Sequence, residues 1–186
     1  MRVSRLVFQT VIIVLGAISC SMATIRNLDV LLHRQEGVNW CWAACDHMVR
    51  EYIGRIPLSQ CSIAAETFGA PAACCPTPDG NCDQPSTSHI ISNYTATQVR
   101  SGANNSLSMT EISTEIDEGR PFIYSKIVGG SNHLMVGIGY SWGTWDAGYI
   151  MTNNPYGLGS RCLISYLSYR NWQASSDTKN FYNIRN

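Results

Sequence analysis

Cys41, His133 and Asn154 are the residues of this chain whose types and order could carry out catalysis by a thiol. Cys41 opens an apolar run, so it is expected at a helix N-terminus, where the backbone dipole stabilises a thiolate. A histidine can take up the thiol proton, and an asparagine oxygen can hold the second ring nitrogen without adding charge. The pattern therefore predicts Cys41 as nucleophile, His133 as base and Asn154 as the residue that orients the base.

Gln35 lies six residues before Cys41 and is the candidate for a further role. Its side-chain amide and the backbone N–H of Cys41 would together stabilise the oxyanion of a tetrahedral intermediate. A glutamine in a loop indicates nothing by itself. The prediction depends on the residue types, their order and their spacing taken together.

Each of these positions has a competing interpretation. Cys45 lies one helical turn after Cys41, where a thiol points into packing, so it is expected in a disulfide or in the core. Asn153 precedes Asn154, and strand alternation would send the two side chains to opposite faces. His133 leads a long apolar run typical of a strand, which the other histidines, His33, His47 and His89, do not. Taken singly, a bonded cysteine, a polar strand start and an Asn-Pro turn explain the same residues.

The composition favours one folded domain without a polyanionic partner. The chain has 186 residues, 45% of them hydrophobic, which suits one compact core and is too little for two ordinary domains. Its 13 basic residues balance 13 acidic ones, so neither nucleic acid nor an anionic membrane surface is an expected partner. We expect a monomer.

The N-terminal segment has the pattern of a secretory signal peptide. A basic start precedes the apolar run Leu6–Ile18, and small residues follow. Cleavage after Ala23 would leave a single domain of residues 24–186; a lipoprotein-type site at Cys20 is the less favoured alternative. The protein is then expected outside the cytoplasm, secreted, extracellular or periplasmic, with no stable membrane insertion after residues 1–23 are removed.

The cysteine count supports an oxidising compartment. Seven cysteines follow the predicted signal peptide, and an odd number leaves one free thiol, which we assign to Cys41. The remaining six allow up to three disulfides: Cys45, Cys61, Cys74, Cys75, Cys82 and Cys162. Adjacent Cys74 and Cys75 are poorly placed to pair with each other. A zinc site formed by Cys61, Cys74, Cys75 and Cys82 is the weaker alternative, because their spacing is irregular.

Hydrophobic periodicity and turn residues predict helices first and strands later, which indicates an α+β fold. Helices are expected over 41–53 and 59–68, and a third begins at the capping box Ser108-Met109-Thr110-Glu111. Strands are expected over 28–32, 122–128, 133–140, 149–152, 161–166 and 181–184. Residues 70–88 are expected to form a loop held by disulfides.

The candidate residues together resemble the papain-like cysteine proteases, and in particular the compact bacterial branch of secreted and effector-type enzymes. The matching positions are Gln35, Cys41-Trp42, His133 and Asn154-Pro155-Tyr156-Gly157. The resemblance implies a two-lobed fold, with an N-terminal helical lobe, a C-terminal twisted antiparallel sheet and a catalytic cleft between them. The Cys-Gly-Ser-Cys signature of the larger members is absent, and the interval of 92 residues between Cys41 and His133 is shorter than theirs.

The resemblance further implies an endopeptidase that hydrolyses peptide bonds of a peptide or protein substrate through a thioester acyl-enzyme. This chemistry requires no metal and no organic cofactor. Only residues 24–40 separate the predicted cleavage site from Cys41, so any restraint of activity is expected from the protein's location or from a separate protein inhibitor rather than from a long prosegment. Two alternatives stay open: acyl transfer by a transglutaminase-like or acetyltransferase-like Cys–His enzyme, and a disulfide-stapled module that binds peptides without cutting them.

Overall fold

The computed structural model describes residues 23–69, 74–75, 78, 80–92, 94, 97–143 and 147–185. The predicted signal peptide and Cys20 lie outside the described residues, as does part of the expected disulfide-held loop. None of the helices within these ranges is long and apolar enough to cross a membrane.

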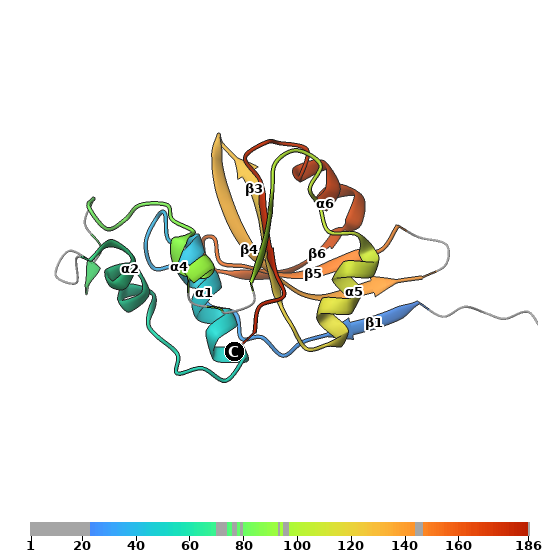
Figure 1. The fold of residues 1–186 in the computed structure, drawn as a ribbon, viewed down its shortest axis with the longest axis horizontal. Coiled ribbons are helices and arrows are strands. Elements are labelled where there is room, and N and C mark those ends of the chain that lie inside the picture. Colours follow the sequence, from blue (N-terminus) through green and yellow to red (C-terminus); the bar gives the residue numbers. More distant parts are fainter. Residues whose placement is uncertain are drawn as a thin grey trace, which may run out of the picture.

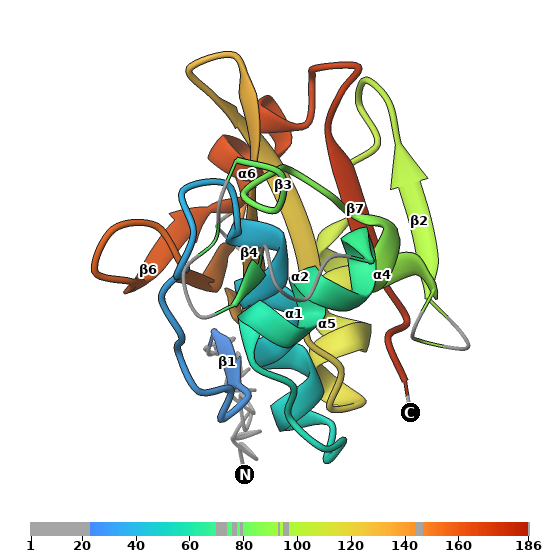
Figure 2. The same cartoon turned by 90° about the vertical axis from the view of Figure 1, so that its left-hand side faces the viewer.

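The N-terminal part of the domain is helical (Figure 2). Its helices are α1 (Cys41–Tyr52), α2 (Gln60–Phe68) and α4 (Ser88–Ser92). The Ser59 side chain caps α2 by accepting the Ser62 N–H, and Gly69 ends the helix in the left-handed conformation that glycine adopts without steric cost. The two helices predicted here from the sequence are confirmed to within a residue at either end.

The C-terminal part is an antiparallel sheet with two further helices (Figure 1). The strands are β1 (Thr24–Asn27), β2 (Gln98–Ser101), β3 (Phe122–Val128), β4 (Ser131–Trp142), β5 (Tyr149–Asn154), β6 (Ser160–Ser165) and β7 (Lys179–Tyr182). Their order is β2-β7-β3-β4-β5-β6, and β1 pairs with β4. The helices are α5 (Met109–Asp117), which begins at the predicted capping box, and α6 (Tyr166–Trp172). The predicted α+β fold with an antiparallel sheet is confirmed, whereas the expected order of helices first and strands later holds only in part, because β1 precedes α1 and α6 follows β6.

The sheet separates two hydrophobic clusters because strand side chains alternate between its faces. Leu134, Val136 and Ile138 of β4 pack into the cluster that contains α1, whereas Met135 packs into the cluster of α5 and α6. Tyr140 joins the second cluster because the register of β4 shifts between Gly137 and Gly139. Figure 1 shows α1 on one side of the sheet and α5 and α6 on the other. Long central strand β4 is thereby fixed from both faces, and its first residues lie beside the start of α1.

Several predicted strand boundaries are wrong. The first strand is Thr24–Asn27 rather than 28–32, and the last is Lys179–Tyr182 rather than 181–184. The strand expected to reach Tyr166 ends at Ser165, whose side chain accepts the Ser168 N–H and so caps α6. Neither α6 nor β2 was predicted, because both are short and lack a clear apolar period.

Two disulfides form, Cys61–Cys75 and Cys74–Cys82, so the expectation that adjacent Cys74 and Cys75 have different partners agrees with the structure. Within the described part of the chain Cys45 and Cys162 are unpaired, which corrects their assignment to a third bridge. Cys45 is instead a buried core residue, its predicted alternative, and Cys162 lies half-buried on β6. Because the four cysteines of the alternative zinc site are the ones joined in these two disulfides, their thiols are not available to bind zinc.

Candidate active site

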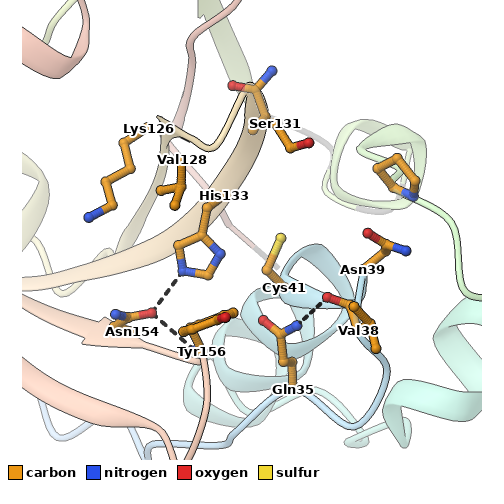
Figure 3. Close-up of a pocket in the computed structure, with 12 residues that line it drawn as sticks. Gln35, Val38, Asn39, Cys41, Lys126, Val128, Ser131, His133, Asn154 and Tyr156 are labelled. Atoms are coloured by element: carbon orange, nitrogen blue, oxygen red, sulfur yellow. Dashed lines mark hydrogen bonds between the residues drawn. The ribbon is translucent and has the colours of Figure 1, made fainter.

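Cys41 is the first residue of α1 and lines a cavity of about 480 Å³ (Figure 3). Trp40, the residue before it, is buried, and its indole N–H donates to the Cys82 carbonyl at 2.9 Å. Trp40 makes no side-chain cap hydrogen bond to α1. The first backbone N–H groups of α1 therefore receive no hydrogen bond from the Trp40 side chain, and they lie next to the Cys41 thiol.

Burial controls the protonation of the Cys41 thiol. The Leu134 N–H points at Sγ from 3.4 Å, and the backbone N–H groups of Trp42 and Cys41 also favour the thiolate. Burial outweighs these contacts, and the pKa of Cys41 is raised above that of an ordinary cysteine. The backbone N–H groups at the helix start do favour the thiolate, as expected from the sequence, but burial opposes it more strongly.

His133 and Asn154 are joined by a hydrogen bond between Nε2 and Oδ1 of 2.8 Å. Asn154 Oδ1 also accepts the Tyr156 backbone N–H at 3.0 Å, and a backbone N–H can only donate. The shared Asn154 atom is thus the oxygen, so the proton in the first bond must belong to His133 Nε2. Nδ1 is then the unprotonated nitrogen, and Figure 3 shows it on the side of the ring that faces Cys41.

The electrostatics favour a neutral imidazole. Burial lowers the pKa of His133 and outweighs the opposite effect of the Asn154 hydrogen bond, and the charge of Lys126 lowers it further. Lys126 is the cross-strand neighbour of His133 in the β3–β4 pair. The pKa of the base is lowered and that of the thiol is raised, so both groups favour their neutral forms at rest over a thiolate–imidazolium ion pair.

Gln35 lines the same cavity, but its side-chain amide nitrogen already donates to nearby carbonyls. Its Nε2 donates to the carbonyls of Gly37 and Val38 at 2.9 and 2.6 Å, while Oε1 is enclosed without a hydrogen-bond partner. The Gln35 backbone N–H is held by the Pro155 carbonyl at 2.9 Å, next to Asn154. The backbone is therefore in place for the predicted role, and the side chain would have to rotate to present its amide.

The competing residues occupy other environments. Cys45 is fully buried, and burial raises the pKa of its thiol well above the usual value. Asn153 is also fully buried and donates to the Val30 carbonyl at 3.0 Å, so it lies on the face opposite Asn154, as alternation predicted. His89 bonds to Asp46 at 2.5 Å within the helical part and is not among the residues that line the cavity.

The walls of the cavity include Tyr156, from the segment that the sequence had marked, and add residues that the sequence did not single out. Val38, Val128 and Tyr156 form exposed apolar parts of the rim, and Lys126 supplies a positive charge. On the other side of Cys41 lies a second hollow of about 200 Å³, which Pro85 and Lys179 help to line. Cys41 thus lines both hollows. The other residues that line them come from segments distant in the sequence, so the sequence alone could not identify them.

Comparison with known proteins identifies relatives of the whole domain. The family described as "Peptidase_C39 like family" matches residues 27–180. The solved structure of a C39-like peptidase from Bacillus anthracis is similar with a TM-score of 0.56 at 10% sequence identity, covering 88% of this chain and 100% of that chain. At this identity the structural likeness concerns the fold alone. No curated protein matches the chain significantly.

Proposed function

Because the chain belongs to the Peptidase_C39-like family, we propose that it is a papain-like cysteine endopeptidase with Cys41 as nucleophile, His133 as base and Asn154 as orienting residue. The observation that carries the proposal is the 2.8 Å bond from His133 Nε2 to Asn154 Oδ1. This bond leaves Nδ1 as a free base on the side of Cys41, in one cavity with it.

The neutral resting pair determines the first step. His133 Nδ1 accepts the Cys41 proton as Sγ attacks the carbonyl carbon of the substrate, and the carbonyl π electrons move to the oxygen. The imidazolium then protonates the departing amine as the C–N bond breaks, leaving a thioester on Cys41. Water, deprotonated by His133, attacks the thioester and releases the carboxylate product with the thiol restored.

The oxyanion would be stabilised by the uncapped N-terminus of α1, first of all by the Cys41 backbone N–H. Gln35 would contribute after its side chain rotates out of its contacts with Gly37 and Val38. Rotation would break the two hydrogen bonds of Nε2, and the unsatisfied Oε1, which costs about 1–3 kcal/mol where it is enclosed, offsets that loss.

The same observations weigh against the alternatives. A module that only binds peptides would be favoured by a bonded Cys41, whereas this cysteine is unpaired. Transglutaminase-like enzymes commonly orient the base with aspartate, whereas the residue here is Asn154. We further propose a secreted single domain of residues 24–186, which two disulfides support because such bonds persist in oxidising compartments.

The test is hydrolysis of a mixed peptide library by the purified protein, with products identified by mass spectrometry. Wild type should generate new peptide termini, and Cys41→Ala should generate none, whereas Cys45→Ala, a matched change one helical turn away, should retain cleavage if folded. An added primary amine that appears in the products would indicate acyl transfer instead. Cleavage by Cys41→Ala equal to that of wild type would refute the proposal.

A further inference from the structure

His33, His47 and Glu51 form a cluster outside the cavity that holds Cys41. His47 and Glu51 are four residues apart on α1, so they share one face of the helix, and His33 comes from the segment that leads into α1. His33 Nε2 lies 2.7 Å from Glu51 Oε2, and the centroids of the two imidazole rings are 4.3 Å apart. One nitrogen or oxygen atom of each residue lies within 4.8 Å of the other two.

The His47 ring has the arrangement of a metal ligand whose metal-facing nitrogen is vacant. The ring lies against the Leu58 backbone, and its Nδ1 is enclosed without a hydrogen-bond partner. Histidines that bind metals commonly donate their other N–H to a backbone carbonyl, which fixes the ring and directs the lone pair at the ion.

We propose that His33, His47 and Glu51 bind one zinc ion, with water in the fourth position. Two imidazoles and a carboxylate suit zinc, whereas calcium and magnesium prefer oxygen ligands alone. Zinc bonds of about 2.0–2.2 Å place tetrahedral ligand atoms about 3.3–3.6 Å apart. The His33 and Glu51 atoms, now 2.7 Å apart, must therefore separate slightly, and atom pairs as far as 4.8 Å apart must approach each other by about 1 Å. The side chains of His33 and Glu51 are 35% and 33% exposed, which leaves them room to turn.

An ordinary hydrogen-bonded cluster is the competing explanation. It accounts for the His33–Glu51 contact, but it leaves His47 Nδ1 buried and unsatisfied. A bound ion would satisfy all three residues at once. Because His33 lies two residues before Gln35, the ion would also fasten the Gln35 segment to α1, a structural role that does not depend on the proposed peptidase activity.

The test is zinc titration of the full chain by calorimetry after alkylation with iodoacetamide, which removes accessible thiols as rival zinc ligands. The protein should bind one zinc ion, and thermal unfolding should shift to higher temperature with zinc. Glu51→Gln and His47→Gln should each weaken binding by at least about tenfold. Glu36→Gln removes the same charge from a nearby exposed carboxylate and should bind as wild type does. Absence of stoichiometric binding, or equal losses in Glu36→Gln and Glu51→Gln, would overturn the site.

A second measurement needs no variant, so it decides the matter even if the substituted proteins unfold. Diethyl pyrocarbonate modifies histidines that have a free ring nitrogen, and mass spectrometry locates the adducts. Zinc should slow the modification of His33 at least about tenfold while leaving that of His133 unchanged. An unchanged rate at His33 with saturating zinc would contradict the proposal.

Discussion

Replacing Asn154 by alanine tests whether this residue positions the base. Its Oδ1 accepts hydrogen bonds from His133 Nε2 and from the Tyr156 N–H, at 2.8 and 3.0 Å. Each such bond contributes about 0.5–1.5 kcal/mol, so the free energy of unfolding should fall by about 1–3 kcal/mol. The bond to Nε2 also selects the tautomer that leaves Nδ1 free, and a loss of about 1 kcal/mol there shifts the tautomer ratio about fivefold.

The catalytic consequence is larger than the tautomer shift alone. The Asn154 hydrogen bond raises the pKa of His133, so its removal also makes the base weaker, and the ring becomes free to rotate. We expect the second-order rate constant for alkylation of Cys41 by iodoacetamide at pH 7 to fall about tenfold or more. Adduct formation at Cys41, followed by mass spectrometry, measures this rate without a known substrate.

Asn153→Ala is the matched control. This neighbouring amide is fully buried and contacts the Val30 carbonyl and Arg161 at 3.0 and 3.1 Å, away from the base. Its loss should lower stability by a similar or larger amount, yet leave the alkylation rate of the folded protein unchanged. If Asn154→Ala is alkylated as fast as wild type, or if both variants lose reactivity equally, the positioning role of Asn154 is refuted.

Three further outcomes follow from burial, packing and cross-linking. Because burial raises the pKa of Cys41 and lowers that of His133, the alkylation rate of Cys41 should rise with pH through the neutral range. A plateau already present at pH 4–5 would indicate a resting ion pair instead. Gly137→Ala should lower the free energy of unfolding in urea by about 1–3 kcal/mol, because the new Cβ would overlap the Phe122 ring. Gly80→Ala is the control, since a Cβ at that position has no atom within 4 Å. Equal effects of the two substitutions would contradict the packing argument. Replacing Cys74 and Cys82 together by alanine should lower stability by about 2–3 kcal/mol for a cross-link across 8 residues, and an unchanged melting temperature would argue against the bond.

The elements with strong local signals were predictable from the sequence. Strand β3 was predicted with its exact bounds, because Phe122–Val128 is rich in aromatic and β-branched residues, with a Pro before it and glycines after it. The capping box at Ser108 was equally clear. Strand β2 and helix α6 were missed because their structure depends on tertiary pairing: β2 is exposed and only four residues long, and α6 begins at a serine cap within a strand-like run.

The candidate site could be predicted by residue type and order but not by protonation state. Cys41, His133, Asn154 and Gln35 do line one cavity, as their sequence pattern suggested. The neutral resting pair could not be anticipated, because burial by segments distant in the chain decides both pKa values. The rotation of the Gln35 amide toward nearby carbonyls is likewise a feature of the folded loop.

Selective labelling of the cysteines by a peptidyl electrophile tests whether Cys41 is a nucleophile that His133 activates. Cys41, Cys45 and Cys162 are the free thiols of the described chain, so the last two serve as internal controls. We expect an adduct on Cys41 alone. In His133→Ala the rate of adduct formation at Cys41 should fall about a hundredfold or more. Preferential labelling of Cys162, or labelling of Cys41 that does not depend on His133, would contradict it.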